Sequence, residues 1–292
     1  MGAFPTATGA AICNAALVDL GGEVLLFDSF LTPKAAKDLR RVSEHLFGRP
    51  PGVVVNSHYH WDHMRGNQVF PEARVVGTTG TRERVLTRGK EGFAGEVEEL
   101  TKALEEIRAA PPPRTEDQRF WEGFFREALE AHPTLSLVAP SWTFDSEMVL
   151  DGSRRRVRLL TYGGGHSGSD AFAYLPEEKL LLMGDQVMVG VHPSLGDGNP
   201  EELIETLQKV ERLPCETVFP GHGSVGGGEE VGRMRRYVED LLVLARDMVE
   251  RGRTADDVAT TPVPKEHADR RLAGMFRENL SFLLARAAAA RP

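Results

Sequence analysis

Hydrophobic and polar positions divide the chain into two successive batches of strands and helices. Glycines, prolines and capping residues mark the ends of these elements. The first batch predicts two short strands around Gly21 and Gly22 within residues 11–28, a helix from Thr32 and Pro33 to Gly48, and strands at residues 53–55 and 74–77. The run at 53–55 is entirely β-branched and apolar, which is typical of a strand in the interior of a sheet.

The second batch follows a stretch of different character. Residues 82–131 are rich in Glu, Arg, Ala and Leu, and the prolines at 111–113 interrupt them, so we expect two or three helices there. The second batch then predicts strands at residues 135–138, 143–150, 156–161, 172–175, 180–183 and 217–219, with a helix at about 201–213. From Glu229 the chain is again helical, in two pieces divided at residues 261–264, and its apolar spacing favours packing on a sheet.

Composition narrows the class of protein. The 292 residues are 41% hydrophobic, which allows a sizeable core, and no run approaches the ~20 apolar residues of a membrane span. The net charge of −8 argues against a nucleic-acid partner. Residues 1–6 lack the features of a signal peptide, and Cys13 and Cys215 lie in no motif. We therefore expect a cytoplasmic protein that acts on a small molecule, without membrane attachment.

The candidate chemistry lies in polar or glycine-rich segments that follow predicted strands. Five of the nine histidines are found there, accompanied by two aspartates. These residues are His58, His60, Asp62, His63, His166, Asp185 and His222. Side chains at the carboxyl ends of strands are where α/β proteins usually place their functional groups.

The densest of these segments is residues 58–63. Histidines at positions i and i+2 of an extended chain point the same way, so His58 and His60 can bind one ion. Asp62 and His63 follow on a turn and face elsewhere, toward a second ion. Imidazole and carboxylate ligands without thiolates suit zinc, iron, manganese or cobalt. One histidine alone is more often a hydrogen-bonded core residue, but three with an aspartate in six residues indicate a metal site.

This segment has the form HxHxDH and resembles the metallo-β-lactamase superfamily. His166 in a glycine-rich turn, Asp185 after a glycine at a strand end, and His222 in Pro-Gly-His-Gly resemble the remaining ligands of that family, in the same order. The resemblance implies an α+β fold, a four-layer αββα sandwich, as a single domain over residues 1–292. It fits least well at about 89–141, where we expect a helical insertion, and it leaves C-terminal helices at about 229–288.

The resemblance also implies which residue holds which ion. It assigns His58, His60 and His166 to the first ion, Asp62, His63 and His222 to the second, and Asp185 to a position between them. Two divalent ions are implied, zinc first, with iron or manganese as alternatives. Asp185 makes the chain similar to the glyoxalase II and lactonase branch rather than to β-lactamases with a cysteine ligand. His60 separates it from the di-iron flavoprotein oxidases.

A metal-dependent hydrolase is the function that the resemblance implies. A hydroxide between two ions, ionised near neutral pH, attacks a carbonyl carbon of an ester, thioester, lactone or lactam. Asp62 is the expected catalytic residue, orienting the hydroxide or moving its proton. The alternatives are an iron-dependent sulfur dioxygenase and a phosphodiesterase or nuclease.

Further residues are candidates for substrate contact. Tyr59, Trp61 and Tyr162 flank ligands and wall the pocket or pack in the core. His192, on the loop after Asp185, contacts substrate or stabilises that loop. The helical insertion is a lid over the metals or a surface for a homodimer.

Overall fold

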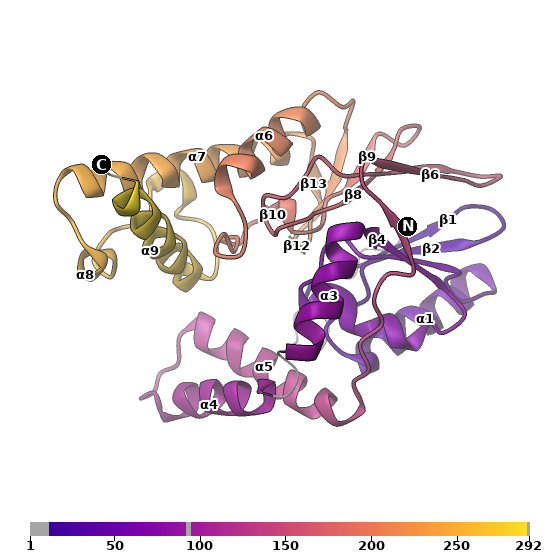
Figure 1. The fold of residues 1–292 in the computed structure, drawn as a ribbon, viewed down its shortest axis with the longest axis horizontal. Coiled ribbons are helices and arrows are strands. Elements are labelled where there is room, and N and C mark those ends of the chain that lie inside the picture. The colour runs from indigo at the N-terminus through magenta and orange to yellow at the C-terminus, as the bar shows by residue number, and fades with distance from the viewer. Residues whose placement is uncertain (1–11, 92–94, 291–292) are drawn as a thin grey trace.

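Two β-sheets lie face to face in the computed structural model, which describes residues 12–91 and 95–290 (Figure 1). The first sheet runs in chain order through β1 (Ala16–Asp19), β2 (Val24–Phe27), β3 (Val53–Val55), β4 (Arg74–Thr78) and β5 (Trp142–Phe144). The second has the order β13 (Gly226–Gly227), β11 (Thr217–Phe219), β9 (Leu180–Leu182), β8 (Phe172–Leu175), β7 (Arg156–Leu160) and β6 (Glu147–Asp151). A separate parallel pair joins β10 (Met188–Val189) to β12 (His222–Gly223).

The alternation of side chains along each strand sorts them between two cores. On β2, Leu25 and Phe27 point into the core between the sheets, where they join Leu159 and Leu182 of the second sheet. The intervening Leu26 points outward, into a different core. The first sheet is therefore buried on both faces, which explains its almost continuous apolar strands.

Helix α1 (Pro33–Phe47) covers the outer face of the first sheet and shares a core with Leu26. The Thr32 side chain caps its N-terminus by accepting from the Ala35 N–H, at 3.2 Å. Gly48 ends it with a φ of 71°, a left-handed conformation that favours glycine. The predicted helix and both of its end signals are confirmed.

The outer face of the second sheet is covered by C-terminal helices. Residues of β8, β9 and β11 share one core with α6 (Pro200–Val210), α7 (Glu229–Glu250), α8 (Ala255–Val258) and α9 (Ala273–Ala289). Helix, sheet, sheet and helix layers confirm the predicted α+β sandwich. Within the described residues, no helix is long and apolar enough to cross a membrane.

The segment between the two sheets is helical, as predicted. It contains α3 (Thr79–Glu91), α4 (Glu96–Ala109) and α5 (Glu116–Ala131). Helices α4 and α5 pack side by side and project from the first half of the molecule (Figure 1). Their free end reaches the C-terminal helices, because Arg271 pairs with Glu116 and the Gly274 N–H donates to Asp117. The α4–α5 hairpin thus spans from one half of the molecule to the other.

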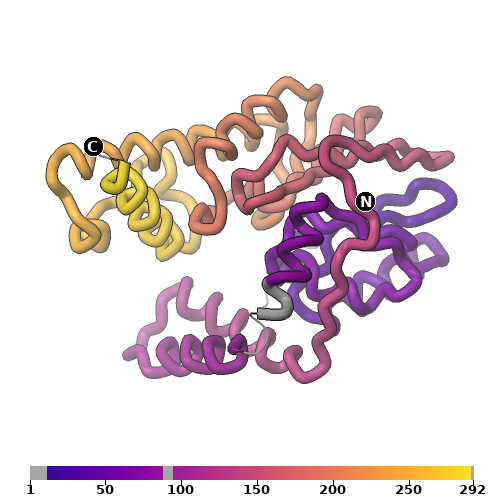
Figure 2. Tube along the Cα trace, in the orientation of Figure 1, coloured from indigo at the N-terminus to yellow at the C-terminus, as the bar shows by residue number. Residues whose placement is uncertain are grey.

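Two strand predictions were wrong. Residues 135–138 form no strand, and the Val138 carbonyl instead accepts from the Asn67 side chain at 2.9 Å. Residues 143–150 are not one strand, because the chain changes sheets at Asp145 and Ser146. Figure 2 shows the tube after the α4–α5 hairpin running from the first half of the molecule to the second. Strand β5 pairs with β4, whereas β6 pairs with β7. The residues before and after this change of sheet both favour strands. The sequence therefore shows one continuous strand pattern where the structure has two strands.

Short elements complete the chain. They are α2 (Trp61–Met64) and the 3₁₀ turns η1 (Arg65–Val69), η2 (His132–Thr134), η3 (Gly184–Gln186) and η4 (Lys265–His267). Of these, α2 and η3 follow buried strands of different sheets, β3 and β9. Both carry residues predicted to bind metal.

Candidate metal centre

All seven predicted ligands follow strands of the sandwich. Those at 58–63 follow β3, His166 follows β7, Asp185 lies in η3 after β9, and His222 lies in β12 after β11. Because β9 and β11 are parallel neighbours, Asp185 and His222 leave the sheet at the same edge. The structure gathers the seven into two groups whose ligand atoms lie within 4.8 Å of one another: His58, His60, His166 and Asp185, and Asp62, His63 and His222.

In the first group, three imidazole rings turn one nitrogen each toward a common point. His60 Nδ1 lies 2.9 Å from His58 Nε2 and 3.0 Å from His166 Nε2. The opposite ring nitrogens face oxygen atoms. They are His58 Nδ1 with Ser57 Oγ at 2.9 Å, His60 Nε2 with Asp197 Oδ2 at 2.9 Å, and His166 Nδ1 with the Ser194 carbonyl at 3.1 Å.

These outer contacts determine which nitrogens carry hydrogen. A carboxylate and a carbonyl only accept, so His60 and His166 donate from their outer nitrogens. Ser57 Oγ donates to Asp28 and therefore accepts from His58. In the neutral form that binds metal each imidazole has one N–H, so the three inner nitrogens then present lone pairs to a common point. Such an arrangement is repulsive on its own and fits a divalent cation.

In the second group, Asp62 and Asp185 face two histidines. Asp62 Oδ2 lies 3.2 Å from His222 Nε2 and 3.5 Å from His63 Nε2. His63 Nδ1 donates to Asp28, at 2.8 Å, so its inner Nε2 is also turned toward the group. Both His63 Nε2 and Asp185 Oδ1 are buried and form no hydrogen bond within the described part of the chain. These two atoms face each other at 3.1 Å as an ion pair when His63 is protonated, and a bound cation would take the place of that proton.

Asp185 lies between the groups. Its Oδ1 is 3.1 Å from His63 Nε2 and 3.3 Å from His222 Nε2, whereas its Oδ2 is 3.4 Å from His166 Nε2 and 3.9 Å from His58 Nε2. Each carboxylate oxygen thus faces a different group.

Burial and charge divide the protonation states between the groups. Burial, reinforced by neighbouring histidines, holds the pKa of His58 well below its usual value. Burial also lowers the pKa of His222, but Asp185 and Asp62 outweigh it and raise that pKa to about 10. His63 and His222 in turn hold the pKa of both carboxyls well below the usual range, against the effect of burial. In the metal-free chain, the protons on His63 and His222 therefore occupy the space where a cation would bind.

Glycine is required beneath Asp185. A Cβ on Gly221 would lie 2.0 Å from Asp185 Oδ1 and 2.6 Å from the backbone carbon of Gly184. Gly184 itself has a φ of +52°, and its Cβ would meet the Ser57 side chain at 2.5 Å. The glycines that flank the ligands therefore allow loops from both halves to approach closely.

The structure separates the four residues predicted to contact substrate. Tyr59 is buried and donates to Asp197, and Trp61 packs with residues of α4 and α5. Tyr162 packs edge-on against Phe172, with ring centres 5.3 Å apart.

His192 lies away from the four other candidate segments, in the core under the C-terminal helices. Its ring lies in the core of the C-terminal helices, 2% exposed, where Nδ1 is 2.9 Å from the Tyr237 hydroxyl. The ring also lies tilted against Phe276, with ring centres 5.8 Å apart. In this conformation His192 offers no surface to a substrate and stabilises its loop, the alternative that the sequence left open.

Sequence reasoning missed two aspartates that accept hydrogen bonds from the outer nitrogens of candidate ligand histidines. Asp28 accepts from the Ser57 N–H and from His63, both at 2.8 Å, and Asp197 contacts His60. Asp28 directly follows β2, so its place at the end of a buried strand was a usable signal. Asp197 had none, because 137 residues separate it from His60.

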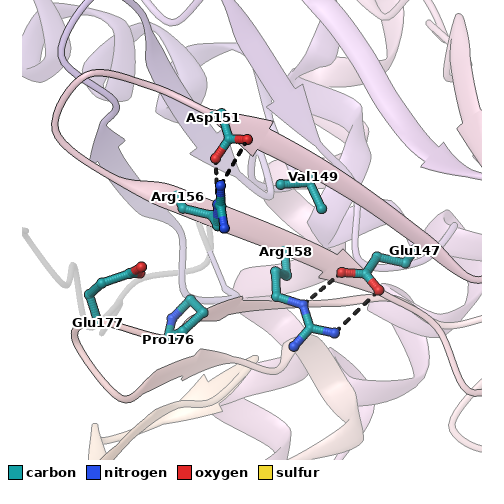
Figure 3. A pocket seen from close by; sticks show the side chains of 7 residues that line it. All are labelled: Glu147, Val149, Asp151, Arg156, Arg158, Pro176 and Glu177. Atoms are coloured by element: carbon teal, nitrogen blue, oxygen red, sulfur yellow. Dashed lines mark hydrogen bonds and ion pairs between the residues drawn. The ribbon is translucent and has the colours of Figure 1, made fainter.

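A hollow on the outer face of β6 and β7 contains none of the seven candidate ligands (Figure 3). Four of its charged side chains form ion pairs across the two strands. Asp151 accepts from Arg156, and Glu147 accepts from Arg158 at 2.6 Å. These ion pairs fill the hollow with mutually satisfied groups, so it does not compete as the active site.

The family of this chain follows from its sequence as well as from this geometry. The profile of the metallo-beta-lactamase superfamily matches residues 8–222, more than half of the chain. The chain belongs to the metallo-β-lactamase superfamily.

Individual relatives are distant. An atrochrysone carboxyl ACP thioesterase of Aspergillus fumigatus is 29% identical over 99 residues, which are 32% of this chain and 31% of the relative. The chain thus matches about a third of that relative's length. Among solved structures, TMB-1 has a TM-score of 0.57 at 16% identity, covering 78% of this chain and 85% of its own. A metallo-beta-lactamase from Pontibacter korlensis has a TM-score of 0.56 at 15% identity, covering 82% and 99%. These two structures share the fold.

Binding of zinc to the metal-free protein is expected to release protons. A ligating imidazole must lose its inner proton, and the raised pKa of His222, about 10, keeps that proton bound at neutral pH. Apparent affinity should therefore rise as the pH rises toward 10 and weaken as the pH falls. Calorimetric titrations near neutral pH, in buffers of different ionisation enthalpy, measure the release. The variant His222→Gln should release fewer protons, and equal release from both proteins would contradict the assignment.

Proposed function

We propose that this chain is a hydrolase with two metal ions that cleaves a carbonyl substrate: an ester, thioester, lactone or lactam. The observation that carries the proposal is the position of Asp185, whose two oxygens face separate groups of ligand atoms. The first ion would be held by His58, His60 and His166, the second by Asp62, His63 and His222, with Asp185 shared. When bound, two divalent ions, zinc first and iron or manganese as alternatives, supply a Lewis acid and ionise a water near neutral pH.

The protein's own groups prepare the site for that chemistry. Asp62 is ionised, because His63 and His222 hold its pKa well below the usual range. Its side chain is 14% exposed, so it can accept a proton from, or orient, a water that enters the site. Asp62 and Asp185 together offset about half of the +4 charge of two divalent ions. The remaining positive charge favours an anionic transition state.

Two observations favour a carbonyl substrate of small-molecule size. The matched relative is a thioesterase by name, which supports esters and thioesters first. Aspartate at position 185 supports the glyoxalase II and lactonase branch, since neither Cys13 nor Cys215 belongs to the two groups. We place this activity in the cytoplasm, where both cysteines remain free thiols.

The α4–α5 hairpin is anchored beside the candidate centre. Arg65, which follows α2, lies 3.7 Å from the centre of the Trp61 ring. It also forms an ion pair with Glu96 of α4 at 2.6 Å, and both side chains are 1% exposed. Breaking a buried ion pair of this kind is strongly unfavourable, so the hairpin is held firmly on the helix that carries Asp62 and His63.

Aromatic residues of α5 supply an apolar surface close to this anchor. The four rings, all of them only partly buried, are Phe120, Trp121, Phe124 and Phe125. Phe120, Phe124 and Phe125 pack in the same cluster as Trp61. We propose that this face binds the apolar part of the substrate, in the role that the sequence suggested for a lid.

Zinc-loaded protein should hydrolyse one or more members of a panel of esters, thioesters, lactones and lactams. His60→Ala removes a ligand nitrogen. Loss of a residue that is hydrogen-bonded to a metal ligand typically lowers activity by about 10- to 100-fold, and the loss in His60→Ala should be larger. Initial rates on the panel, with metal content measured in parallel, test this. Undiminished activity in His60→Ala would refute the mechanism.

The same preparation separates the alternative functions. Steady oxygen uptake by the iron-loaded protein with a persulfide would favour a sulfur dioxygenase. Cleavage of a bis-aryl phosphate well above that of carbonyl esters would favour a phosphodiesterase or nuclease. Either result would replace the hydrolase proposal.

The α5 surface generates a test of substrate selectivity. Trp121→Ala and Phe124→Ala should lower kcat/KM for long-chain acyl esters by about tenfold, with a smaller effect on acetyl esters, because apolar contact area is lost. Trp142→Ala, at an exposed ring on β5, is the matched control. Equal losses on long and short esters would show that α5 does not contact the acyl chain. Metal content should be unchanged in all three variants.

A further inference from the structure

Each group of candidate ligands contains a histidine held from behind by an aspartate. In the second group, Asp28 accepts from His63 Nδ1 at 2.8 Å, and both side chains are at most 1% exposed. In the first group, Asp197 accepts from His60 Nε2 at 2.9 Å, and the two side chains are 27% and 25% exposed. Each aspartate accepts a hydrogen bond from the outer nitrogen of its histidine, but the two aspartates belong to different parts of the fold. Asp28 follows β2 of the first sheet, whereas Asp197 lies on a loop after β10.

That loop, residues 190–198, supports two of the three histidines of the first group. Asp197 accepts from His60 and also from the Tyr59 hydroxyl. Three residues earlier, the Ser194 carbonyl accepts from His166 Nδ1 at 3.1 Å. The loop contributes no ligand to either group. Its contacts fix the ring orientation and the hydrogen position of histidines that come from two different halves of the chain.

The C-terminal helices hold this loop in place. Asn279 of α9 accepts from the Leu195 N–H at 2.9 Å and donates to the Pro193 carbonyl at 2.6 Å. On the same loop, His192 contacts the hydroxyl of Tyr237, on α7. Asn279 is 2% exposed and Tyr237 is fully buried. A continuous set of contacts therefore leads from buried side chains of α7 and α9 to the outer nitrogens of His60 and His166.

We propose that residues 190–198 are a positioning element for the first ion alone, with Asp197 as its main positioning residue and Asn279 as its anchor. This inference rests on the proposed function only in that the seven ligands bind metal. The carboxylate makes the inner nitrogen of His60 a better ligand by accepting from the outer one. No residue of the loop is hydrogen-bonded to His63 or His222 in the described structure. The loop thus supports the first ion only, whereas Asp28 supports His63 directly and His58 through Ser57. The first ion alone depends on the C-terminal helices.

The experiment titrates metal-free protein with zinc and with cobalt, following cobalt absorption as a report of coordination. Asp197→Asn keeps the size of the side chain and one accepting oxygen but removes the charge. It should lower the affinity for one of the two ions by about 10- to 100-fold. Only the absorption of the cobalt ion bound at that position should change. Tyr59→Phe leaves the contact between Asp197 and His60 in place, so it should have a smaller effect. Asp28→Asn should weaken both ions, because Asp28 accepts from His63 and also from Ser57, which accepts from His58.

Controls separate positioning from folding. Asp145→Asn, at an exposed carboxylate, should bind both ions like the unaltered protein. Asn279→Ala should weaken the same ion as Asp197→Asn; should it fail to fold, Asp197→Asn carries the test. Thermal unfolding of the metal-free variants reports stability separately from binding.

Three outcomes would overturn the inference. If Asp197→Asn binds two ions as tightly as the unaltered protein, the inference is refuted and the proposed function is unaffected. Equal weakening of both ions, with a lower unfolding temperature of the metal-free protein, would assign the loop a purely structural role. An unaltered protein that binds neither metal would refute the proposed function along with the inference.

Discussion

The contact on which the rest of this molecule depends is the meeting of three imidazole nitrogens from two halves of the chain. His58 and His60 come from the end of β3, and His166 comes from the loop after β7. Their outer nitrogens face oxygens, so in the neutral form that binds metal the inner nitrogens of His58 and His166 bring lone pairs to within 3.0 Å of the inner nitrogen of His60. Without a cation that arrangement costs free energy, and the surrounding fold must hold it. The two sheets, the glycine turns and the outer partners all serve this purpose.

The sandwich holds these nitrogens in place through buried strands and through the side chains and loops packed around them. The ligands follow buried strands whose side chains fill the core between the sheets. The supports behind them differ: Asp28 is buried in the first half, whereas Asp197 lies on a partly exposed loop tied to α7 and α9. The α4–α5 hairpin approaches from the other side, fixed through Arg65 and Glu96. In the proposed function, the ligands, their supports and the substrate surface are therefore supplied by different parts of one chain.

The parts that could be predicted from the sequence are those with a strong local signal. Three histidines and an aspartate in six residues indicated the site, and the run at 53–55 indicated the strand that presents it. The break between β5 and β6 was missed, because strand propensity does not show which sheet a strand joins. Asp197 was missed because only the folded chain brings it to His60. His192 was placed with its sequence neighbours, whereas its environment is set by helices far along the chain.

The central claim is that Asp185 lies between two bound ions. Anomalous X-ray scattering at the zinc edge, from crystals of zinc-loaded protein, tests it directly. The account predicts two peaks, one at each side of the Asp185 carboxylate and about 3.5–4 Å apart, the spacing of two-metal sites in hydrolases. The first peak should contact His58, His60 and His166, and the second Asp62, His63 and His222. A single peak, or peaks away from these side chains, would contradict it.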